Sequence, residues 1–239
     1  EIPVETDKIK EALKVRGKID RVDIFENNDK LYINIIDYKS SPKDIDLDDA
    51  LEGIQIQLII YLKTLIDKGQ ELFGKKPDIG GVFYYYINDP IFKDDNKTKD
   101  PEEEIFRSLK LRGYVLRDKE IVKLMDKNIG NTSSIIPAAL KNDGEFFENR
   151  TKALTSDGFN NLIDYVYNKC IHMTKSILEG NIDISPYKKT DGTTPCTYCE
   201  YMGICQFDKS LGNNFRLISK MDKDDILKTP KGWDANGLD

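Results

Sequence analysis

Two strand patterns joined by a tight turn constrain this chain more than any other feature. Residues 15–26 (VRGKIDRVDIFE) and 31–39 (LYINIIDYK) are rich in β-branched and aromatic side chains, and the tetrapeptide Asn-Asn-Asp-Lys over 27–30 separates them. Asn and Asp tolerate the positive φ angles that two-residue hairpin turns require. We therefore predict a β-hairpin in which Asn28 and Asp29 are the central turn residues.

This turn also predicts the register of the hairpin, because it places Val22 opposite Ile35 and Asp20 opposite Asp37. Side chains alternate along a strand, so both aspartates fall on one face, and Lys39 lies on that face two residues beyond Asp37. The pattern makes this the apolar, core-facing surface, with Val22, Ile24, Ile33 and Ile35. The opposite face is predicted to be more solvent-tolerant and carries Arg21, Asp23, Phe25, Tyr32 and Asn34.

Two carboxylates that face each other at the end of a core-facing surface repel one another, and burial adds to the cost. A divalent cation between Asp20 and Asp37 would remove this penalty, and oxygen ligands suit Mg²⁺ or Mn²⁺. Lys39 would then orient an attacking water or stabilise charge on a phosphate. In the alternative interpretation, one of the aspartates forms an ordinary ion pair with Lys39 or Arg21.

The remaining pattern alternates between helix and strand. We predict helices over 47–67, 102–111, 118–127 and 157–179, a buried strand at 80–87, and a loop at 88–104, with Thr155 or Ser156 capping the last helix. This order is typical of an α/β fold in which helices flank a mixed sheet.

The predicted helix over 47–67 carries polar side chains in its apolar middle. Gln57 and Tyr61 are four residues apart and therefore share one helical face. Buried polar groups need partners, so these two side chains either satisfy neighbouring backbone groups or line the same site as Asp20 and Asp37.

Composition limits the function classes. The chain has 36 basic and 42 acidic residues and a pI near 5.1, which excludes a basic arm that binds nucleic acid by bulk charge. An acidic nucleic-acid enzyme that acts through metal ions stays possible. We find no apolar run near the roughly 18 residues of a membrane span and no secretory leader, so we expect a cytoplasmic protein without membrane contact. Because the chain begins at Glu1, we expect an excised or processed piece.

Three of the four cysteines form a C-x2-C-x5-C pattern at Cys196, Cys199 and Cys205. Thiolates at this spacing bind Zn²⁺ or an iron–sulfur cluster, and both usually take four ligands. Cys170 is the remaining cysteine, but it lies on an apolar helical stripe, which favours a buried free thiol over a ligand.

Three short motifs carry a resemblance to a known family. GKID (17–20), DYK (37–39) and QLIIY (57–61) resemble the motifs of the RecB-type branch of the PD-(D/E)xK nucleases, in the family's order on strand, strand and helix. The resemblance implies a restriction-endonuclease-like core and metal-dependent hydrolysis of DNA.

It also implies a role for each motif residue. Asp20 and Asp37 would be ligands of Mg²⁺ or Mn²⁺, together with the backbone carbonyl of Tyr38. Lys39 would be the catalytic lysine, and Gln57 and Tyr61 would close the site.

Over most of its length the chain resembles RecB-like nucleases of the AddB type. In these proteins a C-terminal C-x2-C-x5-C joins one cysteine far upstream to hold a [4Fe-4S] cluster. The resemblance implies a nuclease core at 1–185 with a helical insertion at about 100–150, an iron–sulfur loop at 186–208 and a tail at 209–239.

The same resemblance implies partners. These are an AddA-type helicase and DNA, as double-strand break ends and single strands, with the 5′-terminated strand degraded for homologous recombination. A stand-alone or CRISPR-associated RecB-like exonuclease and a non-catalytic DNA-end-binding module are the alternatives.

Overall fold

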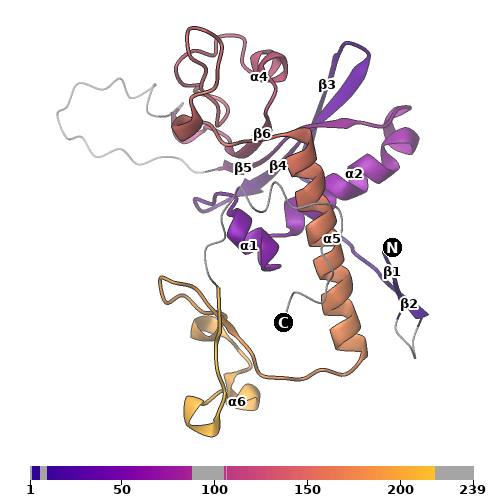
Figure 1. Cartoon of the computed structure of the whole chain (residues 1–239), viewed down its shortest axis with the longest axis vertical. Helices are drawn as coiled ribbons and strands as arrows, with labels where there is room; N and C mark the ends of the chain where they lie inside the picture. The colour runs from indigo at the N-terminus through magenta and orange to yellow at the C-terminus, as the bar shows by residue number, and fades with distance from the viewer. Residues whose placement is uncertain (1, 6–9, 88–104, 106, 219–239) are drawn as a thin grey trace, which may run out of the picture.

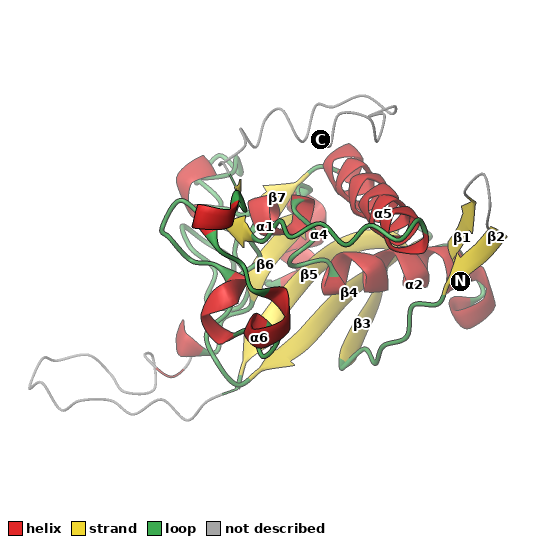
Figure 2. Cartoon of the chain, turned by 90° about the horizontal axis from the view of Figure 1, so that it is seen from below, coloured by secondary structure: helices red, strands yellow, loops and turns green. Residues whose placement is uncertain are grey.

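A five-stranded mixed sheet forms the centre of the computed structural model, which describes residues 2–5, 10–87, 105 and 107–218 (Figure 1). Its strands, in order across the sheet, are β3 (Arg21–Asn27), β4 (Lys30–Lys39), β5 (Asp78–Tyr86), β6 (Arg112–Leu116) and β7 (Ala153–Leu154). The β3–β4 and β5–β6 pairs are antiparallel, whereas β4–β5 and β6–β7 are parallel. Figure 2 shows these strands in yellow, and the predicted mixed sheet is confirmed.

The hairpin at the start of this sheet has the predicted turn and register. Asn28 and Asp29 have φ angles of 49° and 63°, and Val22 pairs with Ile35. The ladder begins at Arg21, however, so the prediction of strand over 15–20 is wrong. This segment forms no strand and instead passes against the helix that carries Tyr61, whose ring lies at Gly17.

Two apolar layers cover the sheet. Ile33 and Ile35 are fully buried in the layer formed with helices α2 (Gln57–Phe73) and α5 (Ser156–Leu178), which cross beside the sheet in Figure 1. Ile36 points into the other layer, formed with the chain around 122–146. Both faces of β4 are therefore buried.

This burial corrects two expectations about the hairpin faces. Tyr32 and Asn34, predicted on a solvent-tolerant face, are buried, because β4 is an inner strand covered on both sides. Ile24, predicted to face the core, is 48% exposed, because β3 is the edge strand and its outer half lies beyond the covering helices.

The predicted helix over 47–67 is two helices, α1 (Leu47–Leu51) and α2. Asp46 caps α1 by accepting hydrogen bonds from the backbone of Asp48 and Asp49. The break follows at Gly53, whose φ of 80° ends the helical path. Continuous apolar periodicity concealed this break.

Of the other predicted helices and strands, some are confirmed, and the structure also contains strands that were not predicted. The strand at β5, the helix α4 (Lys119–Met125) and α5 with its Thr155 cap are confirmed. The short hairpin of β1 (Ile2–Glu5) and β2 (Lys10–Leu13) was not predicted, and β6 lies in the range expected to be a helical insertion. The predicted loop at 88–104 and part of the predicted helix at 102–111 lie outside the described residues.

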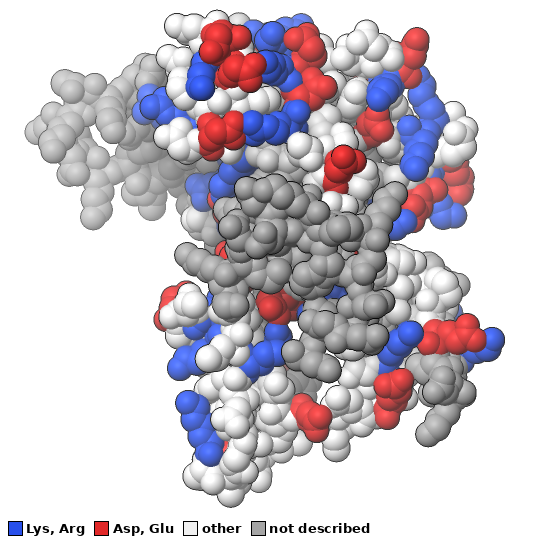
Figure 3. Space-filling view, in the orientation of Figure 1, with Lys and Arg blue, Asp and Glu red and all other residues white. Residues whose placement is uncertain are grey.

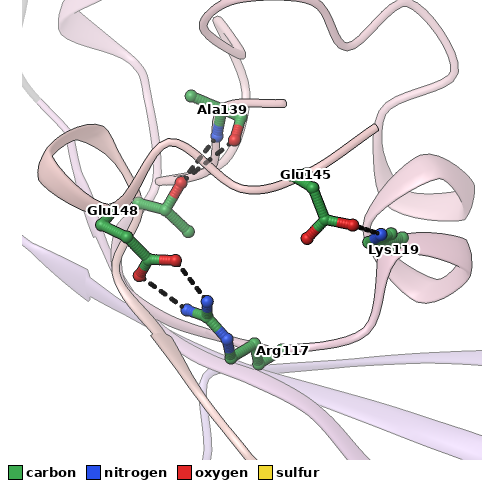
Figure 4. A network of polar contacts seen from close by, with 6 residues as sticks. Arg117, Lys119, Ala139, Glu145 and Glu148 are labelled. Atoms are coloured by element: carbon green, nitrogen blue, oxygen red, sulfur yellow. Dashed lines mark hydrogen bonds and ion pairs between the residues drawn. The ribbon is translucent and has the colours of Figure 1, made fainter. Parts of the chain in front are cut away.

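Polar contacts join the segment after α4 to Arg117, which directly follows β6, and to Lys119, the first residue of α4 (Figure 4). The guanidinium of Arg117 donates to both carboxylate oxygens of Glu148, and this hydrogen bonding lowers the pKa of Glu148. Lys119 forms an ion pair with Glu145, and the Thr151 hydroxyl contacts the backbone of Ala139. Glu148 belongs to the short 3-10 helix η1 (Glu148–Arg150), so these contacts hold that turn against the sheet.

The last described part of the chain, residues 187–218, is called the Cys-rich segment. It contains β8 (Tyr187–Lys188), η2 (Pro195–Tyr198), α6 (Met202–Cys205), η3 (Lys209–Leu211) and β9 (Arg216–Leu217). β8 and β9 form a separate parallel pair, and Figure 1 shows α6 well away from the central sheet.

Charges of both signs are interspersed on the face seen in Figure 3, in keeping with the near balance of acidic and basic residues. Within the described ranges, none of the helices has the length and apolar character that crossing a membrane requires.

Candidate active site

Asp37 lies at the centre of the site, near the end of β4. It is only 4% exposed, and Nζ of Lys39 lies 2.5 Å from its Oδ2 atom. Gln57, in the first turn of α2, donates from Nε2 to Oδ1 of Asp37 at 3.3 Å. Two of the three motifs therefore meet at one buried carboxylate.

Asp20 approaches the same end of the hairpin from the bend before β3. Its Oδ2 atom accepts a hydrogen bond of 3.0 Å from the backbone N–H of Tyr38, the residue between Asp37 and Lys39. Arg21, the alternative ion-pair partner, instead binds Asp23 at 2.7 Å. The backbone contact brings the third motif to the end of β4.

Tyr61 connects the helical motif to the segment before β3. Nε2 of Gln57 lies 3.3 Å from the Tyr61 hydroxyl, one helical turn away. The Tyr61 ring lies against the backbone of Gly17, where an added Cβ would sit 2.4 Å from the hydroxyl oxygen and 2.6 Å from Cε1. Glycine at the first position of GKID thus lets the tyrosine ring pack on the chain that carries Asp20.

Tyr84 and Lys43 also adjoin the site, and the sequence motifs do not include them. Tyr84 pairs with Asp37 across β4 and β5 and is 2% exposed, as expected for the predicted buried strand. Its ring lies 5.3 Å from Nζ of Lys39 and 5.2 Å from Nζ of Lys43. Burial, followed by the charge of Asp37, raises the pKa of Tyr84 to about 12.

The electrostatics of Asp37 fit a hard cation. Its Oδ2 atom is buried and pairs with the Lys39 ammonium at 2.5 Å, the ion pair that the alternative interpretation predicted. Carboxylate oxygens are the preferred ligands of Mg²⁺ and Mn²⁺. Within the described ranges no three His, Cys, Asp or Glu side chains converge into a ligand group.

The cysteines give a different result. Cys196, Cys199 and Cys205 are free thiols on η2, α6 and the turn between them, and they do not converge into a ligand group in the described structure. Cys170 is buried in α5, as expected, and burial raises the pKa of its thiol.

Comparison with known proteins identifies the family of this chain. The family model described as the PD-(D/E)XK nuclease superfamily matches residues 1–206, which include the whole sheet and the cysteine pattern. The chain belongs to the PD-(D/E)XK nuclease superfamily.

Individual members of the superfamily are similar over most of this chain. Three of them are named as a subunit of an ATP-dependent helicase/deoxyribonuclease. The protein of Alkaliphilus oremlandii is 39% identical over 220 residues and that of Clostridium botulinum (Loch Maree) is 39% identical over 218. That of Thermoanaerobacter sp. X514 is 40% identical over 220. These matches cover 90–91% of the chain but only 19% of each relative, so the chain spans about a fifth of their length.

Proposed function

We propose that this chain is a divalent-metal-dependent deoxyribonuclease domain that hydrolyses phosphodiester bonds of DNA ends. The observation that carries the proposal is the meeting of Lys39 and Gln57 at the buried carboxylate of Asp37, with Asp20 bound to the adjoining backbone. A protein that only binds DNA gains nothing from a buried carboxylate held beside a lysine, whereas phosphoryl transfer needs such charges.

The residues have distinct tasks in this proposal. Asp20 and Asp37 would hold Mg²⁺ or Mn²⁺, with the backbone carbonyl of Tyr38 as a further ligand. When bound, the cation would supply Lewis-acid stabilisation of phosphoryl oxygens and lower the pKa of a water.

The other side chains act around that centre. Gln57 donates to Oδ1 of Asp37 and the Lys39 ammonium lies against Oδ2, so both oxygens of the proposed ligand are held in place. The Lys39 ammonium stabilises negative charge on the phosphate during in-line attack by water. Tyr61 holds Gln57 from the next helical turn, and Tyr84 stays neutral beneath Lys39.

The similar proteins support a larger setting for the domain. We propose that it belongs to an AddB-type protein that acts with an AddA-type helicase at double-strand break ends and degrades the 5′-terminated strand for recombination. The relatives' names combine helicase and deoxyribonuclease, and their length is about five times the matched part. This length argues against a stand-alone or CRISPR-associated exonuclease, which would be short.

We also propose that Cys196, Cys199 and Cys205 supply three thiolates of a [4Fe-4S] cluster. The support is their C-x2-C-x5-C spacing, and the fourth thiolate would come from the longer protein, because Cys170 is buried in α5.

Lys39→Ala and Asp37→Asn test the nuclease proposal. With end-labelled linear DNA and Mn²⁺, we expect each variant to lower the cleavage rate by about 100- to 1000-fold, the usual cost of removing one electrostatic stabiliser. The far-UV circular dichroism should not change. Lys68→Ala serves as the control, because Lys68 is exposed on α2, where its ammonium pairs with Glu71.

Calorimetry with Mn²⁺ separates the nuclease from the non-catalytic DNA-end-binding module. We expect the wild-type chain to bind Mn²⁺ and Asp37→Asn to lose most of that binding. A wild-type chain that binds DNA ends but neither binds Mn²⁺ nor cuts would contradict the proposal and support the module.

A further inference from the structure

A buried carboxylate outside the motifs connects the Cys-rich segment to the nuclease core. Asp49, in α1, is 6% exposed, and Nζ of Lys189 lies 2.5 Å from its Oδ1 atom and 2.7 Å from its Oδ2 atom. The two residues are 140 positions apart in the chain. Burial opposes the charge of Lys189, but the hydrogen bond to Asp49 and its negative charge outweigh this and raise the pKa of Lys189.

Asp49 also organises the turn that leads into α2. Nε2 of Gln55 donates to Oδ2 of Asp49 at 2.9 Å. The backbone carbonyl of Asp49 accepts from the N–H groups of Ile54 at 2.8 Å and Gln55 at 3.3 Å. Side chain and backbone of one residue thus hold the two residues that precede the N-cap of α2.

The start of α2 needs such support. Its N-cap residue, Ile56, offers no side-chain acceptor, so no cap of its own fixes the first turn. Gln57 is the first residue of that turn and donates to Asp37 over 3.3 Å, near the long end of hydrogen-bond lengths. Its position therefore depends on the turn held by Asp49.

A second ion pair joins the same two parts. Arg216 of β9 contacts Glu52, which follows α1 directly. Lys189 follows β8, the partner of β9, and its backbone N–H and carbonyl close a small turn with Thr193 and Gly192, just before Cys196. The β8–β9 pair thus contacts the α1–α2 connection at two carboxylates.

We propose that Asp49, held by Lys189, is a positioning residue that sets Gln57 against Asp37, so that the Cys-rich segment supports the nuclease site through this contact. The inference rests on the proposed nuclease function, and it assigns no contact with DNA or metal to either residue. It gives the Cys-rich segment a defined influence on the rate of cleavage.

Asp49→Asn and Lys189→Met test the proposal in the full chain. We expect either change to lower kcat on end-labelled linear DNA with Mn²⁺ by about 10- to 100-fold, since small displacements of a catalytic group have this effect. KM for DNA and the affinity for Mn²⁺ should stay within about twofold, because ligands and DNA contacts are untouched. Lys189→Arg should restore kcat, because it keeps the ion pair.

A double-mutant cycle with Gln57→Ala tests the route of the effect. If Asp49 acts by placing Gln57, Asp49→Asn should change kcat by less than about twofold once Gln57 is already alanine. A merely structural role would lower kcat equally in both backgrounds. Lys188→Met is the matched control, because Lys188 lies over the Phe215 ring and not against Asp49.

Three results would overturn the inference. They are an unchanged kcat in folded Asp49→Asn and Lys189→Met, equal losses with and without Gln57, and a rise in KM alone, which would make Lys189 a DNA contact. Asp49→Asn keeps the shape of the side chain, so its kcat still tests the inference even if Lys189→Met fails to fold. Lys39→Ala, measured in parallel, separates the two proposals, because wild-type cleavage by that variant would contradict the nuclease function itself.

Discussion

Gly17 is a single residue whose lack of a side chain shapes the site. The Tyr61 ring occupies the space that a Cβ at this position would need. Real Cβ atoms do not approach other atoms at 2.4 Å, so any larger residue must displace the ring or the chain. Either movement would disturb Gln57, Tyr61 or Asp20, which supply three of the contacts in the site.

We therefore expect Gly17→Ala to lower the cleavage rate by about tenfold or more while the chain stays folded. Gly130→Ala is the matched control, because no atom lies within 4 Å of a Cβ built there. Steady-state cleavage of end-labelled DNA and circular dichroism measure the two effects. Equal activity of both variants would show that the Tyr61 ring can move at no cost to the site.

Among the secondary-structure elements, the β3–β4 hairpin positions the aspartates and the lysine of the site. Its turn residues Asn28 and Asp29 both have positive φ, the conformation that matches the twist of the strands. The register that follows from this turn ends with Arg21 opposite Ile36, and just beyond it the Asp20 carboxylate accepts from the backbone N–H of Tyr38. Because β4 is also paired with β5, a slip of one residue in the hairpin would send Asp20 to the other face, away from Asp37 and Lys39.

Asp29→Val should lower the free energy of unfolding by about 1–2 kcal/mol, because a β-branched residue is strained at a φ of 63°. Asp29→Gly should lose no stability, since glycine adopts this conformation readily. Urea unfolding followed by fluorescence provides the comparison. If the two variants unfold at the same denaturant concentration, the turn is not under the conformational constraint described here.

In the part of the chain that the structure describes, a central sheet with two covered faces is linked to the Cys-rich segment by the Lys189–Asp49 and Arg216–Glu52 ion pairs. Large apolar side chains of that segment are open to solvent, including Tyr198, Tyr201, Met202 and Ile204. A segment with so little core of its own depends on other sources of stability, and metal ligation is one that cysteines provide.

Cys199→Ser tests this dependence. A longer protein that contains this chain and the proposed fourth cysteine, purified anaerobically, should absorb broadly near about 400 nm, and Cys199→Ser in it should lose both this absorption and bound iron. Cys170→Ser should keep them, because Cys170 is buried in α5 away from the pattern. Colourless protein with bound zinc would contradict the cluster and support a zinc site.

The sequence by itself determined the features that depend on near neighbours. Local φ preferences predict the turn at Asn28 and Asp29, and with it the hairpin register. Local sequence preferences also predict the Thr155 cap, and helical periodicity predicts the grouping of Gln57 with Tyr61. Such rules act over a few residues, so a single sequence reveals them.

Only the tertiary structure decided the break between α1 and α2, the placement of β6 in the sheet and the pairing of Lys189 with Asp49. Apolar residues run through 54–62 and conceal the turn at Gly53, and two adjacent lysines before a turn resemble solvated ones. The Lys189–Asp49 contact spans 140 residues. Contacts of that range depend on how all the layers pack together, because burial and charge pairing are properties of the folded chain and not of any local segment.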